Sequence, residues 1–180
     1  IILESSTNIT VDTTALGLIG DISQGVVEAT DKLTNKQINK SKRKDVSAGD
    51  GIFVINKNEL KYINPNRIEQ SIIKKYLDPN DVFSYGYNWS EKYLIYADKN
   101  TKDEIKRNKD YSNIKKHLDK YKEFITSSNK PYGLHRPRKI KYFHHHKIIF
   151  QGKFVENSFA YDKEKYFIGF SLSILIGLML

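Results

Sequence analysis

Apolar residues in this chain occur in short runs separated by polar stretches, and each run predicts one element. Ile52 to Ile55 is a continuous apolar run of strand length between turn-forming residues, so we expect a central strand there. Lys92 to Ala97 predicts another strand on the same grounds. Two stretches show helical spacing instead, one beginning at Asn64-Pro65 and one over Thr101 to Ser127. The first of these helices would carry a single apolar stripe, made of Ile68, Ile72, Ile73, Tyr76 and Leu77.

The two ends of the chain predict strands and turns. Leu16 to Val27 is typical of a short strand that enters a tight turn, and the lysine-rich stretch after it predicts a long exposed loop. Near the other end, three short runs predict a meander of strands: Lys147 to Gln151, Ser158 to Tyr161 and Tyr166 to Phe170. The apolar stretch from Phe167 to Leu180 is shorter than the ~20 residues that cross a bilayer, so we interpret it as a buried strand and the start of a buried helix.

These elements mix helices and strands without a regular βαβ alternation. They predict an α+β fold with a mixed or largely antiparallel sheet, two main helices and a single domain. The length of 180 residues, with 39% apolar and 28% charged residues, agrees with one soluble core. The chain has no cysteine, which excludes disulfides and thiolate chemistry, and its first twenty residues lack a secretory signal pattern. We therefore expect a cytoplasmic protein.

Charge is distributed unevenly along the chain. The formal net charge is +9, but the abundance of Ile, Asn, Lys and Tyr is typical of AT-rich coding, so part of the lysine content is background. Two segments contain basic residues and no acidic residue at all, residues 124–155 and residues 32–44. Codon drift also supplies Asp and Glu, so it does not explain their absence from these segments. We expect the two segments to converge into one positive face that binds nucleic acid.

Within the longer basic segment, Arg136-Pro137-Arg138 is the favoured contact. Proline keeps the backbone extended between two guanidinium groups, and arginine can pair with guanine or grip a phosphate. One of the arginines could instead hold the loop in place. Lys139 and Lys141 would face the phosphate backbone together on an extended chain. The remaining candidate contacts are Gln24, an adenine reader or a plain turn residue, Lys32 in the other basic segment, and His135.

Metal binding, nuclease activity and other catalytic functions have weaker support in the sequence. His144 and His146 would share one face of a strand, but two imidazoles make a poor metal site, and the run more simply extends the basic face. Asp103-Glu104-Ile105-Lys106 has the carboxylate and lysine spacing of a metal-dependent nuclease, yet it falls in a predicted surface helix. A phosphate-binding loop and a nucleophile elbow are both missing from the sequence. Trp89, the only tryptophan, could stack on a base but more often such a residue packs at a core edge.

Several loose patterns in a fixed order carry a more specific signal. They are Gly20-Asp21-Ile22-Ser23-Gln24-Gly25-Val26-Val27, Gly51-Ile52-Phe53-Val54-Ile55, Ile73-Lys74-Lys75-Tyr76-Leu77, Tyr93-Leu94-Ile95-Tyr96, Ile114-Lys115-Lys116-His117-Leu118, Leu134-His135-Arg136-Pro137-Arg138, Lys147-Ile148-Ile149 and Phe159-Ala160-Tyr161-Asp162. In this order and spacing the chain resembles the TaqI-like C-terminal specificity domain of adenine-N6 DNA methyltransferases and type IIG restriction enzymes. The resemblance implies a lead-in over residues 1–15 and a target-recognition domain over residues 16–180.

The resemblance also implies what lies outside this chain. The sequence has neither a glycine-rich methyl-donor loop nor an Asn-Pro-Pro-Tyr catalytic tetrapeptide, so a methyltransferase domain joined to its N-terminus would flip the adenine and bind S-adenosylmethionine. A nuclease domain, where present, would use Mg²⁺. In such families the apolar C-terminal stretch continues into a helix that begins with a Leu-Leu-Asn-Ser-like motif. Here it ends at Leu180, so we expect a fragment or a truncated gene product with no catalytic centre of its own.

Three hypotheses follow for the function. The leading one is a sequence-specific reader of double-stranded DNA. The second is a sequence-blind protein that binds RNA or single strands by stacking bases on Tyr132, Tyr142 and Phe143. The third is a stand-alone metal nuclease that uses the histidine run and Asp103-Glu104.

Overall fold

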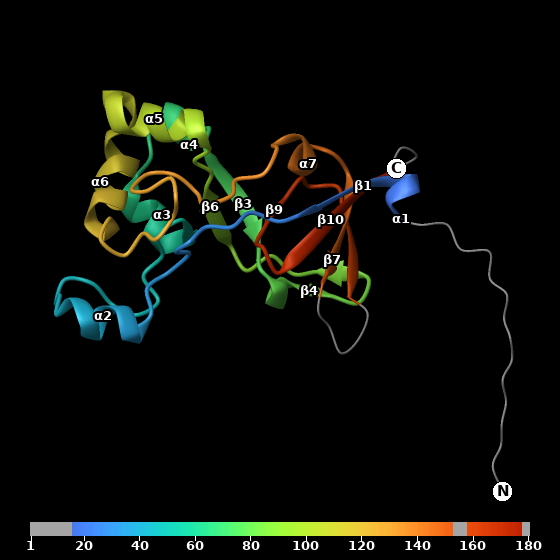
Figure 1. Cartoon of the computed structure of the whole chain (residues 1–180), viewed down its shortest axis with the longest axis horizontal. Helices are drawn as coiled ribbons and strands as arrows, with labels where there is room; N and C mark the ends of the chain where they lie inside the picture. The colour runs from blue at the N-terminus through green and yellow to red at the C-terminus, as the bar shows by residue number, and fades with distance from the viewer. Residues whose placement is uncertain (1–15, 153–157, 178–180) are drawn as a thin grey trace, which may run out of the picture.

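Two four-stranded sheets organise the chain, of which the computed structural model describes residues 16–152 and 158–177 (Figure 1). The helices are α1 (Leu16–Ile19), α2 (Asn35–Ser41), α3 (Lys57–Ile63), α4 (Arg67–Gln70), α5 (Lys99–Arg107), α6 (Ser112–Tyr121) and α7 (Lys141–His144), with 3-10 turns η1 (Pro79–Asp81) and η2 (Lys109–Tyr111). The strands are β1 (Gly20–Gln24), β2 (Val54–Asn56), β3 (Ile73–Leu77), β4 (Val82–Phe83), β5 (Gly86–Tyr87), β6 (Lys92–Ile95), β7 (Lys147–Gln151), β8 (Phe159–Asp162), β9 (Phe167–Ile168) and β10 (Leu172–Gly177).

The sheets occupy different parts of the body. The first sheet has the order β1-β10-β7-β8 and is antiparallel throughout. The second has the order β2-β6-β3-β9 and is mixed, because β9 runs parallel to β3. In Figure 1, helices α3 to α6 gather at one end, the second sheet lies in the middle, and the first sheet lies with α7 at the other end. The predicted α+β class with mainly antiparallel pairing is confirmed.

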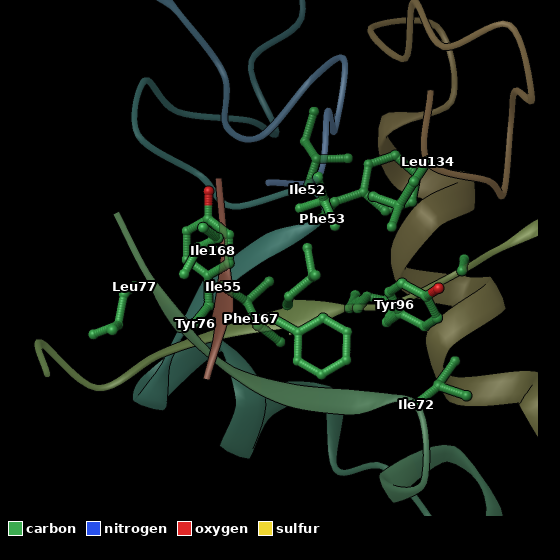
Figure 2. Close-up of a cluster of buried hydrophobic side chains, with 14 of the residues drawn as sticks. Ile52, Phe53, Ile55, Ile72, Tyr76, Leu77, Tyr96, Leu134, Phe167 and Ile168 are labelled. Atoms are coloured by element: carbon green, nitrogen blue, oxygen red, sulfur yellow. The ribbon is translucent and has the colours of Figure 1, made fainter. Parts of the chain in front are cut away.

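The core joins segments that are remote in sequence. Figure 2 shows side chains from the β2 region, β3, β6 and β9 meeting around Phe167, with Leu134 above them. Phe167 is 2% exposed and stacks on the fully buried Phe143 of α7, with ring centroids 4.2 Å apart. Burying one such side chain contributes roughly 1.5 to 3 kcal/mol. The α7 helix is thus tied to the second sheet through aromatic packing.

The segment after β1 connects the two sheets. Val26 forms a parallel bridge with Gly169, and Val27 forms an antiparallel bridge with Arg136. A Cβ atom on Gly25 would lie 2.2 Å from the carbonyl oxygen of Gly169, so only glycine allows this close backbone approach. The turn predicted at the end of the first strand is therefore a close crossing between segments.

The helix predicted from Asn64 to Leu77 is wrong over most of its length. Helix α4 ends after one turn at Gln70, and Ile73–Leu77 is strand β3, between β6 and β9 in the second sheet. The start was also misplaced, since Asn64 ends α3 in the left-handed conformation and Asn66 caps α4. A short run rich in isoleucine and tyrosine fits both the helical and the strand period of apolar residues. Pairing with two neighbouring strands makes it a strand here.

The single long helix predicted over Thr101 to Ser127 is two helices, α5 and α6. Asn108 separates them, because its backbone is extended and its side chain accepts a hydrogen bond from the amide of Asp110. Asparagine favours such caps over a helix interior. Ile114, Leu118 and Tyr121 are buried on α6, so the predicted core stripe is confirmed there.

Three smaller predictions also need correction. The lysine-rich loop contains α2, which Thr34 and Gln37 cap reciprocally. The β2 strand lies at the edge of its sheet and not at the centre, and the Val54 amide at its start donates to the Asp31 carbonyl at 3.3 Å. After β9 the chain forms strand β10 and not a helix up to residue 177. The lead-in predicted over residues 1–15 lies outside the described residues.

Candidate nucleic-acid interface

Residues 124–136, the first part of the longer acid-free segment, run beside residues 27–30, which follow β1. The amide of Thr126 donates to the carbonyl of Ala29 at 3.0 Å, and the hydroxyl of Thr30 donates to the carbonyl of Phe124 at 2.8 Å. Further along, Val27 and Arg136 exchange both backbone hydrogen bonds at 3.0 Å. This ribbon crosses the middle of the molecule and delivers Arg136 to the surface, where its side chain is exposed. The described residues offer its guanidinium no ion-pair partner.

Arg138 and Gln24 bind each other. The Arg138 guanidinium donates to the Gln24 amide oxygen at 2.7 Å and to the Gly25 carbonyl at 3.1 Å, while the Gln24 Nε2 donates to the Phe170 carbonyl at 2.6 Å. Both polar ends of the Gln24 carboxamide are thus committed within the protein. Of the alternatives left open by the sequence, this geometry favours an arginine that holds the loop in place.

The Arg-Pro-Arg segment is not extended throughout. Arg138 has a φ of 63°, in the left-handed region, and its carbonyl accepts a hydrogen bond from the Tyr96 hydroxyl at 3.0 Å. The chain then turns directly into α7, where the Tyr142 amide donates to the Lys139 carbonyl. The prediction that Lys139 and Lys141 alternate along an extended chain is therefore wrong.

Lys139, Lys141 and His135 nevertheless remain near the surface. Lys139 is exposed, and Lys141 is paired with Asp21 at 3.0 Å with both side chains more than half exposed. Such an exposed pair adds little to stability, so a phosphate can replace Asp21 at little cost. His135 is partly buried and its Nδ1 interacts with the Ser128 hydroxyl at 3.1 Å. It packs within the ribbon and is less available than the two lysines.

Cations from two parts of the chain meet around α7. His144, His145, His146 and Lys165 line a depression of about 270 Å³ beside the end of β10. We define the α7 surface as these four residues together with Lys139 and Lys141. Lys165, from the turn before β9, was missed in the sequence because its own neighbourhood contains Asp162 and Glu164.

Burial and neighbouring basic groups both affect the pKa of His144. Partial burial lowers the pKa of His144 below its usual value, and Lys74, Lys165, Lys147 and His145 lower it further. Every charged group that affects this pKa is a cation. The same arrangement favours an anionic ligand, because a phosphate would relieve the repulsion among these groups.

This arrangement predicts a measurable shift. The pKa of His144 should rise when duplex DNA is added, since negative phosphate charge stabilises the imidazolium form. An NMR titration of the histidine ring protons with and without DNA measures it. His117, partly buried on α6 and hydrogen-bonded to the Ile52 carbonyl at 3.0 Å, serves as the internal control and should not change. An unchanged His144 pKa at saturating DNA would contradict contact at this surface.

The two basic segments meet only where the longer one begins, because Lys40 lines a hollow with Phe124 and Thr126, and Arg43 lies over the Phe124 ring. Lys32 forms a backbone bridge with Gly51, and α2 follows it at the helical end of the molecule, whereas α7 lies with the first sheet (Figure 1). Part of the charge in the shorter segment is also neutralised, because Arg43 pairs with Asp45 and Glu123. The expectation of one broad positive face over both segments is wrong.

The aromatic residues of the longer segment serve mainly the core. Tyr132 is 8% exposed and its hydroxyl donates to Asp119 at 2.7 Å, and Phe143 is fully buried. Only Tyr142 remains partly exposed, under the ammonium group of Lys141. Base stacking on all three rings, as the second hypothesis requires, does not agree with this packing.

Trp89 packs as expected at a core edge. Its ring contacts Tyr93 and Tyr166, and its Nε1 donates to the Lys92 carbonyl at 3.0 Å. Lys75 lies over the ring at 5.0 Å from its centroid. The packing interpretation of this residue is confirmed.

The residues suggested for metal chemistry lie apart. His144 ends helix α7 and His146 follows it in an irregular turn, so the strand geometry assumed for the histidine run is wrong. Asp103 and Glu104 lie on α5, at the opposite end of the body from α7 (Figure 1). Within residues 16–152 and 158–177, no group of three His, Asp or Glu side chains could hold a metal ion.

Two further findings concern the chain as a whole. In the part of the chain that the structure describes, no helix is both long and apolar enough to cross a membrane. Comparison with protein-family models and with curated proteins found no match for this sequence.

Proposed function

We propose that this chain is a noncatalytic module that reads a short sequence of double-stranded DNA. The observation that carries the proposal is the α7 surface, where His144, His145, His146 and Lys165 line one depression and the exposed Lys139 and Lys141 lie on the adjoining chain. Phosphate neutralisation by such a surface supplies most of the affinity of a DNA-binding protein. The order of motifs shared with TaqI-like specificity domains supports the same function.

Arg136 is the residue proposed to read a base. Its backbone is held by two hydrogen bonds to Val27, and its guanidinium is exposed beside the α7 surface. A rigid backbone with a free guanidinium suits bidentate pairing with guanine in the major groove. The hydrogen bond between Arg138 and Gln24 helps to hold this part of the chain in place. Lys139 and Lys141 neutralise phosphates.

The proposed partners follow from the same resemblance. A methyltransferase domain would supply S-adenosylmethionine binding and the chemistry on adenine, and this chain would supply the choice of site. An accompanying nuclease domain would need Mg²⁺.

The binding experiment begins with selection from a pool of random duplexes, because the recognised site is unknown. Arg136→Ala should then weaken the binding free energy for the selected duplex by about 1 to 3 kcal/mol and reduce the sequence preference at one position of the site. Lys139→Ala should weaken the selected and a scrambled duplex alike, since phosphates carry no sequence. Fluorescence anisotropy with both duplexes measures the two effects.

Lys99→Ala is the matched control, because Lys99 is equally exposed but lies on α5 at the other end of the body. It should leave both affinities unchanged. Equal losses for Arg136→Ala on the selected and the scrambled duplex would refute the base-reading role. Failure to enrich any sequence would refute specific recognition altogether.

A further inference from the structure

A second polar site lies far from the α7 surface, between α3 and α6. The cleft between these helices has a volume of about 860 Å³, which is the size of a small-molecule site. On α3, Asn58 and Tyr62 are one helical turn apart and so share a face. On α6, Asn113, Lys116 and Lys120 follow the same helical spacing and line the opposite wall.

Several charged groups in the cleft are already satisfied. Glu59 accepts hydrogen bonds from the amides of Gly51 and Asn56 at 2.6 and 2.8 Å. Asp50 accepts from the Tyr121 hydroxyl at 3.1 Å and lies 3.8 Å from Lys120. These carboxylates are therefore held in the scaffold of the cleft by groups of the protein itself.

Other groups in the cleft are uncommitted. Tyr62 is 89% exposed, and among the described residues neither Asn58 nor Lys116 has a side-chain hydrogen bond or ion pair. The Nδ2 of Asn113 donates to the Asn64 carbonyl at 2.9 Å, which leaves its Oδ1 as an acceptor. An aromatic ring beside two amides offers stacking together with donors and acceptors for the edge of a planar base.

A strongly cationic pocket adjoins the cleft at Lys116. It has a volume of about 350 Å³ and lies where α5, η2 and α6 meet. Its basic lining residues are Lys106, Arg107, Lys109, Lys115 and Lys116. No salt bridge within the described ranges involves any of these five side chains. The one carboxylate at the pocket, Asp119, accepts a hydrogen bond from Tyr132 at 2.7 Å.

The two hollows together have the chemistry of a nucleotide site. Lys116 lines both of them, so an anionic group bound in the cationic pocket would lie next to a ring bound in the cleft. We infer that α6 carries a nucleotide-binding site, with the base between α3 and α6 and the phosphate on the cluster around Lys116 and Lys109. The nucleotide is either free or an unpaired unit of a strand. The site is separate from the α7 surface and does not depend on the proposed reading of duplex DNA.

The first experiment uses the intact chain with adenosine monophosphate, adenosine and inorganic phosphate as probes, followed by amide NMR. Adenosine monophosphate should shift the resonances of Asn58, Tyr62 and Asn113 together with those of Lys109 and Lys116. Phosphate alone should shift only the second group. Two results would overturn the inference. One is that all three probes bind without any shift at Asn58 or Tyr62. The other is that no nucleotide probe binds more tightly than about 1 mM.

Variants then separate the two halves of the site. Tyr62→Ala should weaken the binding of adenosine monophosphate about tenfold, because one stacking contact is lost, and should leave the binding of phosphate unchanged. Lys116→Gln should weaken the binding of both ligands about tenfold, because it removes a charge-assisted hydrogen bond. Tyr85→Ala and Lys99→Gln are matched controls, since Tyr85 is 94% exposed and neither residue lines the site. Loss of binding in the controls to the same extent would also refute the site.

A labelled oligoadenylate distinguishes the two sources of the nucleotide. If the ligand is a unit of a strand, the oligonucleotide should bind at least about tenfold more tightly than the mononucleotide, and Tyr62→Ala should reduce that affinity. If the ligand is free, the two affinities should be similar. Lys139→Ala should change neither, so failure of this inference and failure of duplex recognition at α7 can be told apart.

Discussion

Replacing Lys147 with methionine should lower the free energy of unfolding by about 3 to 5 kcal/mol, the largest effect that we expect for a single substitution. Lys147 and Asp162 are both fully buried, and their charged atoms lie 2.5 Å apart across β7 and β8. Burial lowers the pKa of Lys147, and the attraction of Asp162 opposes that change. Without the lysine, Asp162 would remain buried with its charge uncompensated. Urea unfolding followed through the fluorescence of Trp89 measures the loss.

Two further variants make this prediction specific. Lys57→Met breaks a pair with Glu91 that also has a distance of 2.5 Å but is half exposed, and it should cost less than about 1 kcal/mol. The double variant Lys147→Met with Asp162→Asn removes both charges and keeps an acceptor for the amides of Glu164 or Tyr166, so it should recover much of the loss. A double variant that is no more stable than Lys147→Met alone would contradict the charge explanation.

The stability of the protein should fall as the pH rises from about 4.5 to about 7 because of Glu28. Burial raises the pKa of Glu28 from 4.5 to about 7, against the opposing hydrogen bond from the Tyr76 hydroxyl at 2.8 Å, and the charge of Asp31 adds to the rise. Between these two values the folded state holds a proton that the unfolded state has lost. A shift of this size corresponds to about 3 kcal/mol of stability, which is fully present below the unfolded pKa and is lost progressively until the pH exceeds the folded pKa.

Glu28→Gln tests this dependence. The carboxamide oxygen can still accept the Tyr76 hydrogen bond, so the variant should match the parent at about pH 4.5 and exceed its stability by about 3 kcal/mol at about pH 8. Urea unfolding at several pH values gives the comparison. Glu164→Gln, at an exposed carboxyl, should follow the parent at every pH. If Glu28→Gln and the parent show the same pH dependence, the carboxyl of Glu28 does not control it.

Some elements of the fold could be predicted from local pattern because local pattern decides them. The strand at Lys147–Gln151 has the predicted bounds, and the strand from Lys92 ends two residues earlier than predicted. In both, a short apolar run lies between turn residues. The stretch 73–77 could not be assigned in this way, because its residues suit a helix and a strand, and its neighbours β6 and β9 come from distant parts of the chain.

The candidate site was predicted in part. The acid-free segment 124–155 supplies most of the α7 surface, and its exposed lysines were identified from sequence. The roles of Arg138 and Gln24 were not, because their hydrogen bond joins residues 114 positions apart. Tyr132 and Phe143 could not be distinguished from stacking residues by type alone, since an aromatic ring suits both a core and a base. The cleft between α3 and α6 could not be recognised as a sequence motif. Its two walls come from separate helices, and the polar face of each helix is typical of an ordinary solvent-exposed surface.

The sequence alone determined the α+β class, the positions of most apolar runs and the segregation of acidic from basic residues, since these depend on composition and on spacing within a few residues. Only the tertiary structure decided that helices α2 and α7 of the two basic segments lie apart, that Arg138 is tied to Gln24 while Arg136 is free, and that Lys165 joins the histidine run. The physical reason is that charge and hydrogen bonding act between neighbours in space, and sheet pairing sets which remote segments become neighbours.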